Sequence, residues 1–307
     1  MEDDMTNALT KTQYRQLALI TLAAAALFIL VRLLPTGTNI PHLSYVPAGK
    51  SIIQTCDPSN PQFLPATEVQ SPVAMTLAVA APPVAGREAH VVLMLKTYGD
   101  KPLGPADIAV SNAKKIHLLI VDPTLTDYQH VHPVPADAPG AWAFTFTPRA
   151  GGAYRFFADF VPVVTGVELY AWADLTVRGA RAAPVPSSHQ NWTADSDGYR
   201  FTLTPAALPI RPRKINDLKL SIERIGGGPV PLEVIMDAFA HLVAFDEQRS
   251  GFGHMHPLEV DITKPLDPAH PTLHFKMQLP RAGRYVIWSE VQIAGRQVFA
   301  PFWFNAE

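Results

Sequence analysis

The chain is poor in cysteine and in net charge. Cys56 is the only cysteine among 307 residues, so no disulfide can form within the chain. An unpaired cysteine outside the cytoplasm can still form a disulfide between two chains, and this alternative stays open. The formal charge is -2 and no basic cluster exceeds four residues. Such a chain lacks the positive surface that follows a phosphate backbone, and we predict no nucleic-acid partner.

Two motifs of hydrolytic enzymes are also missing. The sequence contains neither H-E-x-x-H, which supplies zinc ligands and a general base, nor G-x-S-x-G, which presents a nucleophilic serine. We therefore predict that the protein is not an enzyme. Proline is abundant instead, with 30 residues against 18 glycines, which favours loop-rich β structure and extended linkers over helices.

One apolar run lies close to the N-terminus. Residues 1–15 are polar, and residues 16–34 supply 19 mostly apolar positions, close to the roughly 20 that a membrane-spanning helix needs. No small-x-small cleavage site follows, so we predict an uncleaved transmembrane signal anchor. Lys11 and Arg15 precede the run, which predicts a cytoplasmic N-terminus and places the rest of the chain outside the cytoplasm.

One short pattern occurs twice. His130-Val131-His132-Pro133 returns 124 residues later as His254-Met255-His256-Pro257, and the same offset carries His117 onto His241. Pro148-Arg149-Ala150-Gly151 likewise reappears as Pro280-Arg281-Ala282-Gly283. An aromatic strand with one acid follows each time, Asp159 in the first copy and Glu290 in the second. This repetition predicts two copies of one domain.

The spacing of β-rich runs and turn residues predicts the fold. Short runs rich in β-branched and aromatic residues alternate with turn signals, as in β-sandwiches. These runs lie at 75–80, 89–97, 116–121, 142–147, 154–160 and 168–177, and again at 199–204, 217–225, 240–245, 273–279, 285–292 and 298–304. We predict an all-β protein: two tandem immunoglobulin-like or cupredoxin-like β-sandwiches behind one N-terminal transmembrane helix. The predicted parts are a Pro-rich spacer at 35–72, a first sandwich at 73–178, a linker at 179–197 and a second sandwich at 198–307.

The repeated histidines predict a metal site in each copy. Residues two apart on a strand point to the same side, so His130 and His132 can reach one centre. The predicted ligands are His117, His130, His132 and Asp159 in the first copy, and His241, His254, His256 and Glu290 in the second. Imidazole with an oxygen ligand suits Cu(II) or Zn(II), and we favour copper over zinc. A blue-copper centre is excluded because neither copy contains a cysteine.

The same motif also has a structural interpretation. At the end of a strand, each imidazole of H-x-H-P can bond a turn carbonyl, and the proline then stops the strand. The protein would in that case bind no metal.

The first copy resembles a known group of bacterial proteins. The stretches 116–122, 127–133 and 152–160 are similar to a pattern in YtkA-like modules of the bacterial envelope, which are small sandwiches often discussed with metal handling. The resemblance implies an immunoglobulin-like or cupredoxin-like fold and a place in the envelope. The second copy departs from the pattern, with Gly251-Phe252-Gly253 in place of Asp127-Tyr128-Gln129.

Together these features predict a single-pass inner-membrane protein whose C-terminal domains lie in the periplasm. Its predicted function is to bind metal, with copper favoured, for delivery, buffering or assembly of a copper enzyme, with an envelope protein as partner. The alternative is a metal-free interaction module of an envelope complex. A metal-dependent enzyme is the third and weakest reading.

Overall fold

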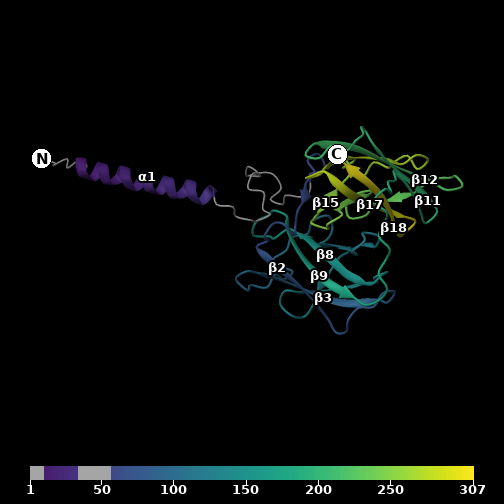
Figure 1. The fold of residues 1–307 in the computed structure, drawn as a ribbon, viewed down its shortest axis with the longest axis horizontal. Coiled ribbons are helices and arrows are strands. Elements are labelled where there is room, and N and C mark those ends of the chain that lie inside the picture. The colour runs from purple at the N-terminus through teal and green to yellow at the C-terminus, as the bar shows by residue number, and fades with distance from the viewer. Residues whose placement is uncertain (1–9, 34–56) are drawn as a thin grey trace. The chain divides into compact units, whose positions relative to one another are not determined.

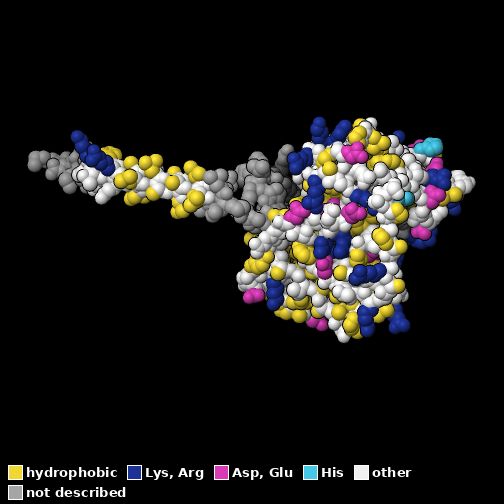
Figure 2. Space-filling view, viewed as in Figure 1, with side chains coloured by type: hydrophobic (Ala, Val, Ile, Leu, Met, Phe, Trp, Pro, Cys, Tyr) yellow, Lys and Arg dark blue, Asp and Glu magenta, His cyan; other side chains and the backbone are white. Residues whose placement is uncertain are grey.

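The computed structural model describes residues 10–33 and 57–307, which form two separate units, a helix and a globular part. The helix is α1 (Lys11–Leu33), and by length and composition it could cross a membrane. Beyond the Lys and Arg side chains at its start, many of the exposed side chains along it are apolar (Figure 2).

The helix begins five residues before the predicted start at 16. The reason is a capping box: Thr10 Oγ1 accepts a hydrogen bond from the backbone N–H of Gln13 at 3.3 Å. Gln13 Oε1 in turn accepts one from the N–H of Thr10 at 2.8 Å. Two backbone donors that the first turn leaves free are satisfied in this way. Cys56, and with it the predicted intermolecular disulfide, lies outside the described residues.

The first sandwich consists of two four-stranded antiparallel sheets, blue to teal in Figure 1. One sheet has the order β2-β3-β7-β6 and the other the order β5-β4-β8-β9. This arrangement has the strand order of an immunoglobulin-like sandwich, A-B-E-D against C′-C-F-G. The strands are β2 (Val73–Val79), β3 (Ala89–Thr97), β4 (Ile116–Val121), β5 (Tyr128–Val131), β6 (Val134–Pro135), β7 (Ala141–Phe146), β8 (Gly152–Phe160) and β9 (Leu169–Val177).

The second sandwich, green to yellow in Figure 1, has a similar plan, but its first sheet gains an edge strand next to β11 where the first sandwich has one next to β7. One sheet has the order β10-β11-β12-β16, and the other places β15, β14, β17 and β18 side by side. The short strand β13 pairs with the far end of β17. The strands are β10 (Thr193–Ser196), β11 (Tyr199–Pro205), β12 (Ile215–Arg224), β13 (Leu232–Glu233), β14 (His241–Asp246), β15 (Phe252–Met255), β16 (Thr272–Gln278), β17 (Gly283–Ile293) and β18 (Arg296–Ala306). The all-β prediction with two tandem sandwiches is confirmed.

Two predicted connections take part in the fold. The last residues of the predicted linker form β10, which pairs with β11 at the edge of the second sandwich. The end of the predicted spacer forms β1 (Phe63–Leu64), which pairs with β15 of the second sandwich before the chain enters the first. The globular part therefore begins before the predicted boundary at 73.

Three apolar cores hold the globular part together. One lies inside each sandwich. The third joins them, because it combines Leu119, Tyr128 and Phe157 of the first sandwich with Phe245 and Trp288 of the second. The sheets that carry β4 and β14 are therefore covered on both faces. Every residue of both strands is buried, as expected for strands in the middle of a layered structure.

Candidate metal centre

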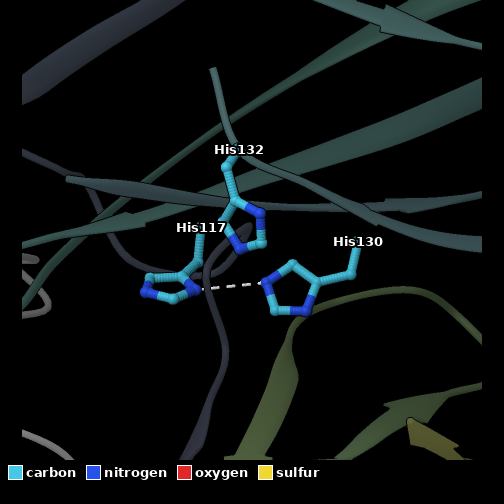
Figure 3. Close-up of side chains that lie close together, drawn as sticks. All are labelled: His117, His130 and His132. Carbon is cyan, nitrogen blue, oxygen red and sulfur yellow. Dashed lines mark hydrogen bonds between the residues drawn. The ribbon is translucent and has the colours of Figure 1, made fainter. Parts of the chain in front are cut away.

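Three histidines from each sandwich gather at the face that the two sandwiches share. In the first sandwich His117 lies on β4, His130 on β5 and His132 directly after β5 (Figure 3). One ring nitrogen from each of the three lies within 4.8 Å of the others. His241, His254 and His256 form the same group in the second sandwich. We call these groups triad 1 and triad 2.

Strand alternation places the triads at the shared face. On β4, Leu118 and Ile120 point into the first core, whereas Leu119 and Val121 belong to the core between the sandwiches. His117 has the parity of Leu119 and so points to the same side. The hydrophobic pattern of the strand thus determines where its histidine points.

A backbone carbonyl fixes the ring of His117. Its Nε2 lies 3.0 Å from the carbonyl oxygen of Ser111, and this oxygen can only accept a hydrogen bond. Nε2 therefore carries the proton, and Nδ1 of the neutral ring presents a lone pair. That Nδ1 lies 3.2 Å from Nε2 of His130, the contact marked by the dashed line in Figure 3.

A carboxylate fixes the ring of His130 in the same way. Its Nδ1 lies 2.7 Å from Oε2 of Glu290, and both side chains are fully enclosed. When the carboxyl group is ionised, Nδ1–H donates to it and Nε2 presents a lone pair. Two lone pairs then face each other across 3.2 Å, a repulsive arrangement that a cation between them would relieve.

Triad 2 repeats these contacts. Nε2 of His241 lies 3.0 Å from the carbonyl oxygen of Ile235, and its Nδ1 lies 3.2 Å from Nε2 of His254. Nδ1 of His254 lies 3.4 Å from Oδ2 of Asp159. Two different sequences thus arrive at one hydrogen-bond pattern.

The third histidine of each triad has a free nitrogen. Nε2 of His132 and Nε2 of His256 are buried atoms without a hydrogen-bond partner. A buried polar atom without a partner costs on the order of 1–3 kcal/mol and therefore calls for an explanation. A metal ion bound to that nitrogen would provide one.

The surroundings disfavour protonation of the rings. Burial, reinforced by the neighbouring imidazoles, lowers the pKa of His132 to about 2 and that of His241 to about 3. The same causes lower the pKa values of His130, His254 and His256 well below the ordinary value. Neutral imidazole is the form that ligates metals.

Burial acts on the two acids in the opposite direction. It raises the pKa of Asp159 to about 6 and that of Glu290 to about 7, because it penalises the charged form. A divalent cation in each triad would offset this penalty, since it would place positive charge on the opposite side of the histidine ring to which each carboxylate is bonded.

The acids are placed differently from the prediction. Asp159 and Glu290 do lie opposite His117 and His241 in the strand register. Each acid, however, hydrogen-bonds to a histidine of the other sandwich, Glu290 to His130 and Asp159 to His254. The prediction grouped each acid as a ligand with the histidines of its own copy. The structure instead places each acid behind a histidine of the opposite triad.

The two triads are neighbours. The ring centroids of His117 and His254 are 5.9 Å apart, and those of His130 and His254 are also 5.9 Å apart. Those of His130 and His241 are 6.3 Å apart. The six histidines form one cluster between the sandwiches.

Comparison with known families agrees with the internal repeat. The model of a family described as a domain of unknown function, DUF8832, matches the chain twice, at residues 67–179 and 193–307. The chain belongs to the DUF8832 family. Each DUF8832 domain of this protein carries one triad and one of the two acids. The resemblance to the YtkA-like group is a separate matter and stays a prediction.

Other comparisons add little. No curated protein matches the chain. Among solved structures, the fibronectin(III)-like modules of CbhA from Clostridium thermocellum share 11% identity at a TM-score of 0.20, covering 75% of this chain and 93% of theirs. A DUF4785 family protein from Legionella pneumophila shares 9% identity at a TM-score of 0.23, covering 74% of this chain and 55% of its own. These likenesses carry no argument about function.

The sequence did not predict the backbone carbonyls of Ser111 and Ile235 that hold the rings of His117 and His241. Both lie six residues before the strand histidine, in loops whose shape the sequence does not specify. The sequence analysis also gave no prediction of the apolar core between the two sandwiches. A signal for that contact was present, because Ile116–Val121 and His241–Asp246 read as almost continuous apolar runs, which indicate strands covered on both faces.

Proposed function

We propose that this DUF8832 protein binds two copper ions, one in each triad, and holds them outside the cytoplasm for delivery, buffering or assembly of a copper enzyme. The observation that carries the proposal is the orientation of the rings. In each triad three ring nitrogens converge, while the opposite nitrogens of two rings bond a carbonyl and a carboxylate. Metal-ligating histidines are held in this way in proteins.

The spacing of the nitrogens supports a metal ion. Two ligands of a tetrahedral metal with bonds of about 2.0 Å stand about 3.3 Å apart. The separation between Nδ1 and Nε2 is 3.2 Å in both triads. The same separation also suits a proton between two rings, which is the alternative that the experiment below must distinguish.

The ligand set favours copper. Three imidazoles suit copper and zinc, and at a given nitrogen site the divalent series places copper above zinc. Without a thiolate the site would lack the strong absorption of blue copper. We therefore expect weakly coloured Cu(II), with zinc as the competing ion.

The surroundings favour a binding role over catalysis. Both buried acids of the centre hydrogen-bond to histidine rings, so neither is free to act as a general base. On this basis we propose that the protein is not an enzyme. We further propose that α1 anchors it in the inner membrane and that the sandwiches lie in the periplasm, where an envelope partner would exchange copper with them. Lys11 and Arg15 at the start of the helix support this orientation.

The alternative function is a metal-free interaction module. It is favoured by the apolar core between the sandwiches, which joins them without any metal. In that case the triads would serve as buried polar contacts within the interface.

Metal content decides between these functions. The full chain, purified in detergent, is loaded with copper or zinc, desalted and measured by mass spectrometry. We expect about two equivalents of copper, lost when His130, His132, His254 and His256 are all replaced by alanine. The matched control replaces four exposed histidines, His90, His189, His270 and His274, and should retain both equivalents.

A second measurement covers the case in which the quadruple variant fails to fold. X-ray absorption of the copper-loaded unsubstituted protein should show nitrogen ligands at about 2.0 Å and no sulfur shell near about 2.3 Å. If the unsubstituted protein retains neither metal, the interaction module becomes the better account.

A further inference from the structure

We infer that the two triads work as one centre, in which each metal site is completed by a carboxylate from the other sandwich. This inference rests on the proposed function and adds to it how the two sites depend on each other. Glu290 would be a positioning residue for triad 1, and Asp159 for triad 2.

The hydrogen bonds that cross the interface carry the inference. His130 and Glu290 are 160 residues apart and belong to different sandwiches, yet their side chains meet at 2.7 Å. His254 and Asp159, 95 residues apart, meet at 3.4 Å. The exchange is reciprocal: each sandwich contributes one acid to the other.

Strand pairing alone does not explain why each acid bonds to a histidine of the other sandwich. Glu290 is the direct cross-strand neighbour of His241, a member of its own triad. Its two oxygens nevertheless bond elsewhere, Oε2 to His130 and Oε1 to the side-chain amide of Gln297 at 3.2 Å. The carboxylate is thus held from within the second sandwich and directed at the first.

The crossing contact has a chemical consequence. A carboxylate on Nδ1 of His130 selects the tautomer whose Nε2 lone pair faces the rest of triad 1, and it makes that nitrogen more basic. Without the acid the ring can turn or change tautomer. Removing such a partner lowers metal affinity by about 10- to 100-fold.

The consequence extends to the interface. Because triad 1 is complete only when the second sandwich is docked, copper binds the docked form more tightly than the separated one. Any ligand that prefers one form stabilises it. Copper should therefore strengthen the contact between the sandwiches, and the contact should strengthen copper binding.

Further contacts hold the sandwiches in this arrangement. Arg155 donates a hydrogen bond to the carbonyl of Arg249 at 2.8 Å, and Arg249 donates one to the carbonyl of Ala153 at 2.8 Å. The indole N–H of Trp288 donates to the carbonyl of Leu125 at 3.3 Å. The positions of both acids are therefore fixed by contacts well outside the triads.

The test measures each site separately. In a first background, His254→Ala and His256→Ala leave only triad 1; in a second, His130→Ala and His132→Ala leave only triad 2. Glu290→Gln is added to each background, and Cu(II) affinity is measured on the full chain in detergent by competition with a chelator. We expect a loss of about 10- to 100-fold in the first background and a change below about threefold in the second.

Asp159→Asn is the matched substitution and should give the opposite pattern. Its loss should fall on triad 2, and it should be the smaller of the two because the contact is longer. Electron paramagnetic resonance of bound Cu(II) gives an independent result: Glu290→Gln should change the spectrum of the triad 1 protein and leave that of the triad 2 protein as it was.

Three outcomes overturn the inference. If Glu290→Gln weakens triad 2, the acid serves its own sandwich. If it weakens neither site while both bind copper, the contact is structural only. If the unsubstituted protein binds no copper, the proposed function itself fails, and the inference fails with it.

Discussion

Triad 1 and triad 2 have the same three histidines and the same ring contacts but are covered differently. His132 is half-buried and lines a mostly apolar groove of about 830 Å³, whose wall includes Val92 and Ala143. His256 is buried, and the chain that follows it is tied down, with Leu258 donating its N–H to the carbonyl of His274 at 2.8 Å. The repeat has kept the histidines while the segments that cover them have diverged.

The difference suggests a division of roles. A metal site that exchanges its ion needs a path to solvent, whereas a site that stabilises the fold is better closed. His132 of triad 1 lines the groove, whereas no residue of triad 2 does. We therefore expect triad 1 to exchange copper and triad 2 to retain it.

Lowering the pH tests the buried histidines that both triads share, and we expect it to have the largest effect on stability. Five triad histidines have lowered pKa values, so the folded protein binds fewer protons than the unfolded one, and stability falls as pH drops below about 6.5. Asp159 and Glu290 have raised pKa values and act in the opposite direction, but two acids offset only part of the effect of five histidines. The melting temperature of the metal-free protein should therefore be lower at pH 5 than at pH 7.5. An unchanged or higher value at pH 5 would contradict this balance.

Replacing the third histidine of each triad, His132 or His256, tests whether the two sites are buried to different degrees. His256→Ala removes a buried ring and should lower the free energy of unfolding of the metal-free protein by about 2 kcal/mol or more, through the cavity that it leaves. His132→Ala removes a partly exposed ring and should cost about 1 kcal/mol or less. Denaturant unfolding of both variants in the presence of a chelator measures the two losses. Equal losses would show that the two sites are equally closed.

Exchange kinetics test the division of roles directly. When a chelator is added to the copper-loaded protein, release should occur in two phases that differ by about tenfold or more in rate, equivalent to about 1.4 kcal/mol in barrier height. Disabling triad 1 with His130→Ala and His132→Ala should remove the fast phase. Disabling triad 2 should remove the slow one. A single phase in the unsubstituted protein would argue against distinct roles.

The smallest effect concerns an aromatic pair. Tyr128 lies in the core between the sandwiches, with a buried hydroxyl that has no hydrogen-bond partner, and the equivalent residue of the second copy is Phe252. Tyr128→Phe should raise the free energy of unfolding by about 1 kcal/mol, because it removes that unsatisfied group. Copper stoichiometry should remain at two. A clear loss of copper would instead assign the hydroxyl to the metal site.

The sequence was sufficient for the longer strands and for the grouping of the histidines, because both follow from local periodicity, but it placed the short strands β1 and β10 in a spacer and a linker. The run around His117 alternates between the two cores, and the H-x-H spacing brings His130 and His132 together. The partners of Asp159 and Glu290 were not accessible in this way. They depend on how two folded sandwiches dock, and no spacing within either copy encodes that geometry.

The second copy also departs from the first at Gly251, and the structure supplies the reason. A Cβ at this position would lie 1.7 Å from the carbonyl oxygen of Leu64, so only glycine lets β1 approach β15. In the first copy the corresponding residue is Asp127, whose carboxylate accepts a hydrogen bond from Tyr154 at 2.7 Å. The two copies therefore differ where one of them receives an additional strand.

That additional strand means that the family boundaries do not delimit an independent domain. Residues 193–307 match DUF8832 as a unit, yet β1 at Phe63–Leu64 completes their sheet from the opposite end of the sequence. A fragment limited to 193–307 would leave the outer edge of β15 unpaired, and an uncovered edge is a template for joining other chains. Such a fragment is expected to aggregate, whereas a fragment beginning near residue 57 keeps β1 and all the other strands of the four sheets.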